Sequence, residues 1–140
     1  MNDLVREAAE HYGSLRSVAG VHAFRPNAAR DSRYDEYVFA FDRGSLTVTA
    51  EPSDDSIHLG GTGATLPHVT DLSNEEPWAR LIGCGILWIW RLTNHNGFVD
   101  GLQLELGQPG ECWSVQLMCE GSALSARSLG SLDRMSNLIG

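Results

Sequence analysis

A strict alternation of apolar and polar residues in the last third of the chain does most to limit the possible folds. Leucines at every second position from Leu102 to Leu106 alternate with Gln103 and Glu105, and a second alternating run covers residues 113–119. Successive side chains of a strand point to opposite faces of its sheet, so each run predicts a strand with one buried and one wet face. The glycine-containing turn between the runs predicts that the two strands are antiparallel neighbours.

The first half of the chain shows the same kind of pattern. Alternating runs at residues 37–41 and 46–50 lie on either side of a turn that contains Gly44, which predicts a β-hairpin. Residues 18–24 and 56–59 predict shorter strands before and after this hairpin.

Two segments predict helices. Residues 2–16 carry apolar side chains at helical spacing, and Ser73 followed by Glu76 fits a capping box that opens a short helix ending near Ile82. We therefore predict a single α+β domain over residues 1–140. In this fold the N-terminal helix packs on a mostly antiparallel, meander-like curved β-sheet with one short middle helix.

Residues 86–93 are rich in aromatic and branched side chains, which predicts a central strand buried on both faces. Trp88 and Trp90 then share one face as core anchors, and Arg91 and Asp100 could form a cross-strand ion pair. The alternative is that the aromatic pair with its flanking charges forms an interaction hot spot, which has the same composition.

The chain is acidic, with a formal net charge of −8 and a pI near 4.9. Such a surface repels phosphate backbones, so we expect no nucleic-acid partner, whereas it attracts basic proteins and cationic ligands. All ten basic residues are arginine. The lack of lysine excludes Schiff-base chemistry and a phosphate-binding P-loop.

Nothing in the sequence indicates export or membrane insertion. The start of the chain lacks the pattern of a signal peptide, and the longest apolar run, residues 81–90, is far shorter than the ~20 residues that span a bilayer. With three cysteines and no paired framework, we expect reduced thiols and a cytoplasmic location.

No residue pattern supports catalysis, a metal or a cofactor. Several possible ligands lie close in sequence, namely Asp54, Asp55, His58, His68 and Asp71, but they lack the spacing of zinc and calcium sites. Cys84 lies between two glycines, and it would need His95 or His58 beside it to act as a nucleophile. We therefore predict a protein that is not an enzyme and needs no metal or cofactor.

Residues 77–106 carry a pattern of Trp88, Trp90, Leu92-Thr93-Asn94, Gly97-Phe98 and Asp100-Gly101, preceded by Pro77-Trp78. In this segment the chain resembles a family of small, uncharacterised bacterial proteins. Such acidic α+β proteins are in turn similar to the immunity proteins of toxin systems, which bind and block a cognate toxin. The resemblance implies a protein partner and supplies no catalytic residues.

The leading hypothesis is a non-enzymatic, immunity-type binding protein that inhibits a basic, toxin-like partner through an acidic surface. Loop carboxylates can reach a cationic partner with little desolvation before contact. The residues expected to bind the partner are Asp31, Asp35, Glu36, Asp54, Asp55, Asp71, Glu75 and Glu76.

Two alternatives remain open. The first is a small-molecule-binding protein or enzyme with a pocket between sheet and helix, where Arg91, His95 and Asp100 would be the polar groups. The second is a structural or regulatory subunit that dimerises through a last edge strand, predicted at residues 122–129. The sequence does not determine the oligomeric state.

Overall fold

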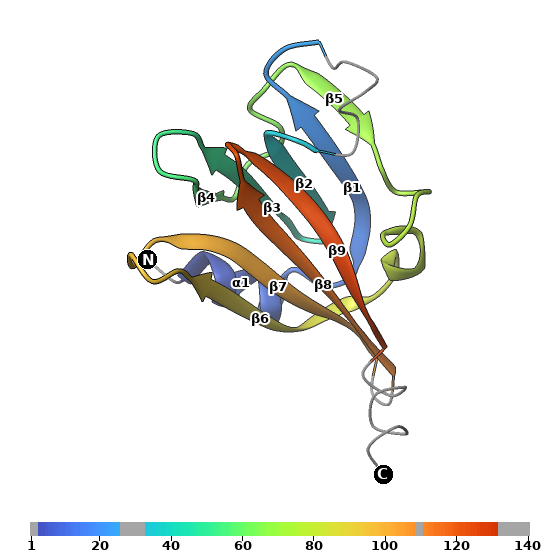
Figure 1. Ribbon diagram of the computed structural model, residues 1–140. Helices are drawn as coiled ribbons and strands as arrows, with labels where there is room; N and C mark the ends of the chain where they lie inside the picture. The colour runs from blue at the N-terminus through green and yellow to red at the C-terminus, as the bar shows by residue number, and fades with distance from the viewer. Residues whose placement is uncertain (1–2, 26–32, 109–110, 132–140) are drawn as a thin grey trace.

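The computed structural model describes residues 3–25, 33–108 and 111–131, and it shows one helix and two antiparallel sheets (Figure 1). The predicted α+β class with mostly antiparallel strands is confirmed. The elements are α1 (Asp3–His11), β1 (Leu15–His22), β2 (Glu36–Phe41), β3 (Gly44–Glu51), β4 (Ser56–Gly60), β5 (His68–Asp71), η2 (Ala79–Leu81), β6 (Gly85–Thr93), β7 (Val99–Gln108), β8 (Glu111–Glu120) and β9 (Ala123–Ser131).

The strands divide into two sheets instead of one. The first sheet has the order β4-β3-β2-β1-β5, and the second is the meander β6-β7-β8-β9 (Figure 1). The predicted hairpin of β2 and β3 forms with Phe41 opposite Gly44, and β7 and β8 pair as antiparallel neighbours. Strand β5 was not predicted, and it joins the first sheet beside β1.

The core lies between the two sheets. Tyr37, Phe39 and Phe41 of β2 share one buried face, as the alternation predicted, and Leu102 and Leu106 of β7 belong to the same buried cluster. Burial of such large side chains supplies most of the driving force for packing one sheet on the other.

Short backbone contacts join the sheets directly. Tyr34 and Leu124 exchange two hydrogen bonds, with N···O distances of 3.0 and 2.6 Å. The Leu15 amide donates to the Cys84 carbonyl at 2.8 Å, and Ser14 forms an antiparallel bridge with Gly85. Both ends of the interface are therefore fixed by main-chain contacts.

The N-terminal helix is shorter than predicted. It ends at His11 because the chain turns at Gly13, which has a positive φ of 82°, and Leu15 already belongs to β1. Ala8 is buried, and Leu4 packs partly against the core. The helix contacts β6 and β3, so it covers the interface on one side (Figure 1).

The capping box predicted at Ser73 does not form. The Ser73 hydroxyl instead accepts a hydrogen bond from the Val18 amide of β1 at 3.0 Å, and the Glu76 carboxylate pairs with Arg80. The two side chains that would cap a helix are therefore used elsewhere. The middle helix is only the single 3-10 turn η2.

The prediction that residues 86–93 form a central strand buried on both faces is wrong. Strand β6 lies at the edge of the second sheet, and the side chains of Trp88 and Trp90 are 55% and 47% exposed. The Trp90 indole satisfies its N–H by donating to a Glu105 carboxylate oxygen on β7 at 3.2 Å. An indole is apolar over most of its surface and has one polar group, which suits this half-wet position.

Candidate functional site: an aromatic pocket bordered by acidic residues

The candidate site is built around the loop at residues 71–78, which follows the short strand β5. The Leu72 amide donates to the Val18 carbonyl at 2.8 Å, and the Ser73 hydroxyl accepts from the Val18 amide. These two bonds attach the loop to β1. They hold Glu75 and Trp78 over the end of the core, because both follow closely in the chain.

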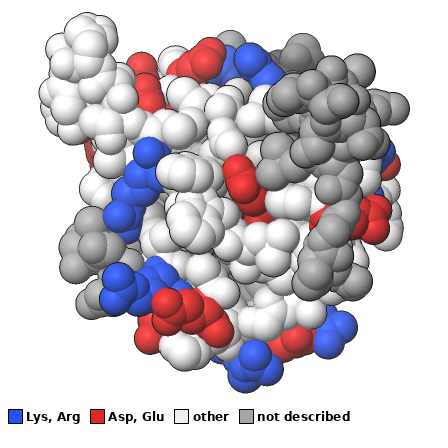
Figure 2. Space-filling view, turned by 90° about the horizontal axis from the view of Figure 1, so that it is seen from below, with Lys and Arg blue, Asp and Glu red and all other residues white. Residues whose placement is uncertain are grey.

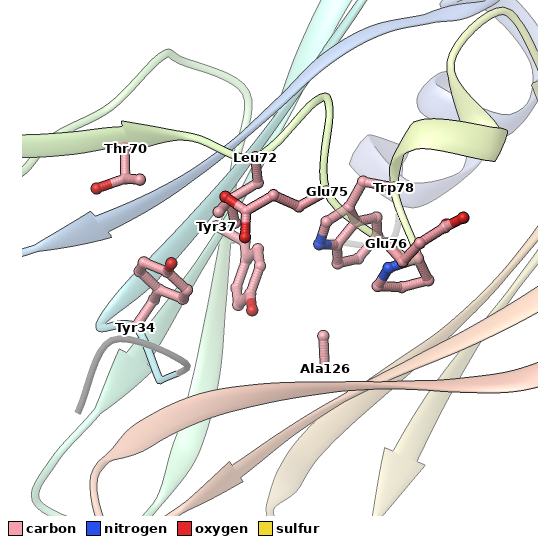
Figure 3. A pocket seen from close by; sticks show the side chains of 9 residues that line it. Tyr34, Tyr37, Thr70, Leu72, Glu75, Glu76, Trp78 and Ala126 are labelled. Atoms are coloured by element: carbon pink, nitrogen blue, oxygen red, sulfur yellow. The ribbon is translucent and has the colours of Figure 1, made fainter. Parts of the chain in front are cut away.

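A pocket of about 390 Å³ lies beneath this loop, at the junction of the two sheets (Figure 3). Its volume falls within the roughly 300–1,000 Å³ that is usual for ligand sites. The first sheet and its loop supply most of the wall, and Ala126 on β9 supplies the opposite side (Figure 3). The lining residues are Tyr34, Tyr37, Thr70, Leu72, Glu75, Glu76, Pro77, Trp78 and Ala126.

Three aromatic rings form the inner part of the pocket. The ring centroid of Tyr37 lies 5.3 Å from that of Tyr34 and 5.7 Å from that of Trp78. Phe39 packs edge-on against Trp78 from the core side, with centroids 5.4 Å apart. Because all three lining rings are buried, the rotamers that shape the pocket are held by packing.

Two carboxylates lie at the rim, and they differ in their surroundings. Glu76 is bound by Arg80, whose Nε and Nη2 donate to its two oxygens at 3.0 and 2.7 Å. The same guanidinium lies 4.7 Å from the ring centroid of Trp113. Glu75 is exposed and points toward Tyr37 (Figure 3), and within the described part of the chain its carboxylate has neither a hydrogen bond nor an ion pair.

The electrostatic environment of the pocket is that of an anion beside neutral rings. Burial raises the pKa of the Tyr37 phenol, and the charges of Tyr34 and Glu75 raise it further. The phenol therefore stays neutral at physiological pH. A cation entering the pocket would meet the negative faces of aromatic rings and one ionised carboxylate.

The pocket does not contain the groups of a hydrolytic or nucleophilic site. Its described lining has no thiol and no imidazole, and Thr70 is its only aliphatic hydroxyl. Such a lining is suited to binding a ligand through charge and ring contacts. The sequence pattern that could have indicated it is the adjacency of two acids with Pro77 and Trp78; Tyr34, Tyr37 and Ala126 come from distant parts of the chain and gave no such signal.

Of the acids predicted to bind a partner, the structure brings Asp71, Glu75 and Glu76 together on the pocket loop. Asp71 is exposed at the end of β5. Hydrogen bonds from Ser73 lower the pKa of its carboxyl, so it is ionised at neutral pH. These three residues form the only part of the predicted set, within the described chain, that borders the pocket.

The remaining predicted acids lie elsewhere. Asp54 and Asp55 are in the turn between β3 and β4, where Asp55 accepts a hydrogen bond from the Ser122 amide at 2.7 Å. Asp35 is half-buried and accepts from the Ala23 amide at 2.8 Å. Asp31 lies outside the described residues.

Glu36 does not lie on the surface. Its side chain is fully buried on β2, where it accepts hydrogen bonds from the Thr49 hydroxyl at 2.9 Å and from the amide and hydroxyl of Thr65. Both carboxylate oxygens are thus engaged within the protein. Its burial is incompatible with direct contact to a partner.

The alternative pocket residues Arg91, His95 and Asp100 do not line the pocket that the structure contains. Arg91 lies opposite the buried Leu102 in the β6–β7 register, and His95 is exposed in the turn that follows β6. Asp100 accepts a hydrogen bond from the Asn94 side chain at 3.4 Å. The predicted position of a pocket, between sheet and helix, is therefore corrected to the junction of the two sheets.

Charge on the molecular surface is not gathered everywhere into acidic patches. On the face shown in Figure 2, acidic and basic side chains are interspersed around broad uncharged areas. A search for three or more His, Cys, Asp or Glu side chains placed to hold a metal finds none among the described residues. No helix in the described ranges is long and apolar enough to cross a membrane.

The described architecture is that of a small α+β protein with two facing antiparallel sheets and an acid-bordered aromatic pocket at their junction. The chain belongs to the DUF6334 family, a family of unknown function, whose family model matches residues 1–132. This confirms the predicted membership of an uncharacterised family. No curated protein and no solved structure matches the chain.

Proposed function

We propose that the protein is a non-enzymatic binding protein of immunity type, which captures and inhibits a basic, toxin-like partner protein. The observation that carries this proposal is the position of Asp71 and Glu75 on the pocket loop. Both are exposed and acidic, and Glu75 has no basic neighbour bound to it in the described chain. They are carboxylates available to an external cation.

The overall charge supports the same function. A net charge of −8 on 140 residues accelerates encounter with a basic surface, because the long-range field concentrates the partner near the acidic protein. The fixed loop adds specificity, since its hydrogen bonds to Val18 hold the carboxylates in place before the partner arrives.

The test uses the products of genes adjacent to the one that encodes this chain. A basic product that is toxic to cells is purified as an inactive variant, and its binding is measured by calorimetry at low and high salt. We expect a 1:1 complex whose affinity falls as salt rises, and we expect co-expression of this chain to restore growth. Absence of a toxic neighbour that binds, or binding unaffected by salt, would overturn the proposal.

A pair of variants of equal charge locates the surface. Replacing Asp71 by Asn and Glu75 by Gln removes two negative charges from the pocket loop. Replacing Glu7 and Glu10 by Gln removes two exposed charges from α1. We expect the loop variant to lose about tenfold or more in affinity and the helix variant to change little, since hot-spot contacts are local. Equal losses would show that only net charge matters.

A further inference from the structure

We infer that the pocket beneath the 71–78 loop is a binding site for a guanidinium group, held by ring stacking and by the Glu75 carboxylate. This inference rests on the proposed function to the extent that a partner's arginine is one source of the group. A free small guanidinium compound is the other source. The chemistry at the site is the same for both.

The shape of the pocket favours a flat cation. Tyr34, Tyr37 and Trp78 present ring surfaces with centroids 5.3 and 5.7 Å apart around Tyr37. A guanidinium is planar, weakly hydrated and stacks on aromatic faces, whereas an ammonium is compact and strongly hydrated. Rings that are this deeply buried disfavour a cation that must keep its water, so lysine is the poorer occupant.

The rim supplies a matching anion. Glu75 points over Tyr37 and is exposed, so its two oxygens can accept parallel hydrogen bonds from an incoming guanidinium (Figure 3). Its negative charge also contributes to the raised pKa of the Tyr37 phenol, which places charge and ring in electrostatic contact.

The protein already contains this arrangement once, four residues along the chain. Arg80 makes two hydrogen bonds to Glu76, at 3.0 and 2.7 Å, while its guanidinium lies 4.7 Å from the Trp113 ring. The Glu75 carboxylate with Tyr37 and Trp78 repeats the carboxylate–aromatic part of that geometry within one pocket. The internal pair shows that a guanidinium is compatible with this rim.

The experiment measures binding of arginine methyl ester and lysine methyl ester to the full chain by two-dimensional NMR. The indole N–H signal of Trp78 reports on the pocket, and the signals of Trp88 and Trp90 report on a distant, exposed strand. We expect arginine ester to shift the Trp78 signal and to bind at least tenfold more tightly than lysine ester. Equal affinities, or equal shifts of all three tryptophans, would overturn the inference.

Variants with matched charge complete the test. Glu75→Gln is exposed and should fold normally, and we expect it to weaken arginine ester binding about tenfold or more. Glu7→Gln, an equally exposed acid on α1, should leave binding unchanged. An unaltered affinity in the Glu75 variant would contradict the assignment even if the ester binds.

Two further ligands separate the sources of the guanidinium. Tighter binding of a capped peptide with a central arginine than of free L-arginine identifies a protein side chain as the ligand, and the reverse order identifies a small molecule. If a partner protein binds but Glu75→Gln has no effect on it, the pocket inference fails and the proposed function stands. If the arginine ligands bind and no toxin partner does, the opposite holds.

Discussion

The ring of Tyr34 lies directly against Gly20 of β1. A Cβ atom added at Gly20 would come within 2.4 Å of two ring carbons of Tyr34, far inside normal contact distance. Glycine at this position therefore lets the ring that lines the pocket pack on the sheet.

Replacing Gly20 by Ala should destabilise the fold by about 1–3 kcal/mol, because the ring must move out of a packed site. It should also weaken binding of arginine ester, since Tyr34 forms part of the pocket wall. Gly63→Ala is the matched control, because nothing lies within 4 Å of its added Cβ. Chemical denaturation measures both; equal stability of the two variants would contradict the close contact.

The buried and exposed tryptophans should respond differently to truncation. Trp78 is buried and contacts Tyr37 and Phe39, so Trp78→Ala should cost about 3–5 kcal/mol of unfolding free energy. Trp88 is 55% exposed, and Trp88→Ala should change stability by less than about 1 kcal/mol. Urea denaturation checks both values. A large loss at Trp88 would restore the interpretation of this residue as a core anchor.

Stability should fall in acid because four carboxyls have lowered pKa values in the folded state. At Asp42 the main cause is the hydrogen bond from the Ser14 amide, followed by the one from Arg16; Ser53 acts on Glu51, Ser73 on Asp71 and Arg80 on Glu76. The unfolded chain takes up these protons first as pH falls. The stabilisation is therefore complete above the ordinary values of 3.8 and 4.5 and is lost below them.

Urea midpoints measured between neutral pH and about pH 3 test this dependence. Asp42→Asn should be less stable than the parent at neutral pH, and it should lose less stability on acidification. Glu7→Gln should keep the acid sensitivity of the parent, since this acid accepts none of the four hydrogen bonds. A parent whose stability does not change with pH would contradict the assignment.

The thiols should react slowly at neutral pH. Burial raises the pKa of Cys119 to about 11, and burial together with the charge of Glu111 raises the pKa of Cys84. Only the thiolate attacks disulfide reagents, so the folded protein should react far more slowly than free cysteine, and denaturant should release all three thiols. One fast, stoichiometric reaction in the folded state would revive Cys84 as a nucleophile.

The strand-forming parts of the fold could be predicted because each pattern was local. The alternation at Leu102, Leu104 and Leu106 gave the correct buried face, and the turn before Leu46 gave the correct hairpin. The position of β6 at a sheet edge could not be predicted in this way. A run of apolar residues shows that a strand is present, but the number of its neighbours depends on strand order.

The candidate site was predicted only in part, for the same physical reason. Glu75 and Glu76 were expected to contact a ligand because they are acids in a loop, and they do border the pocket. The rings of Tyr34 and Tyr37 reach it from separate strands and loops, and Ala126 reaches it from the other sheet. Contacts between residues so far apart in sequence follow from tertiary packing, which residue patterns do not report.

The hydrogen bonds of Glu36 have a practical consequence for any mutational survey of the acidic residues. This carboxylate fastens Thr65, in the connection after β4, to the outer side of β2 and β3. Exchanging it for a neutral or basic residue would leave buried donors unsatisfied and detach that connection. A loss of partner binding in such a variant would report a damaged scaffold, so charge scans belong on Asp71 and Glu75, where the protein presents its carboxylates to the solvent.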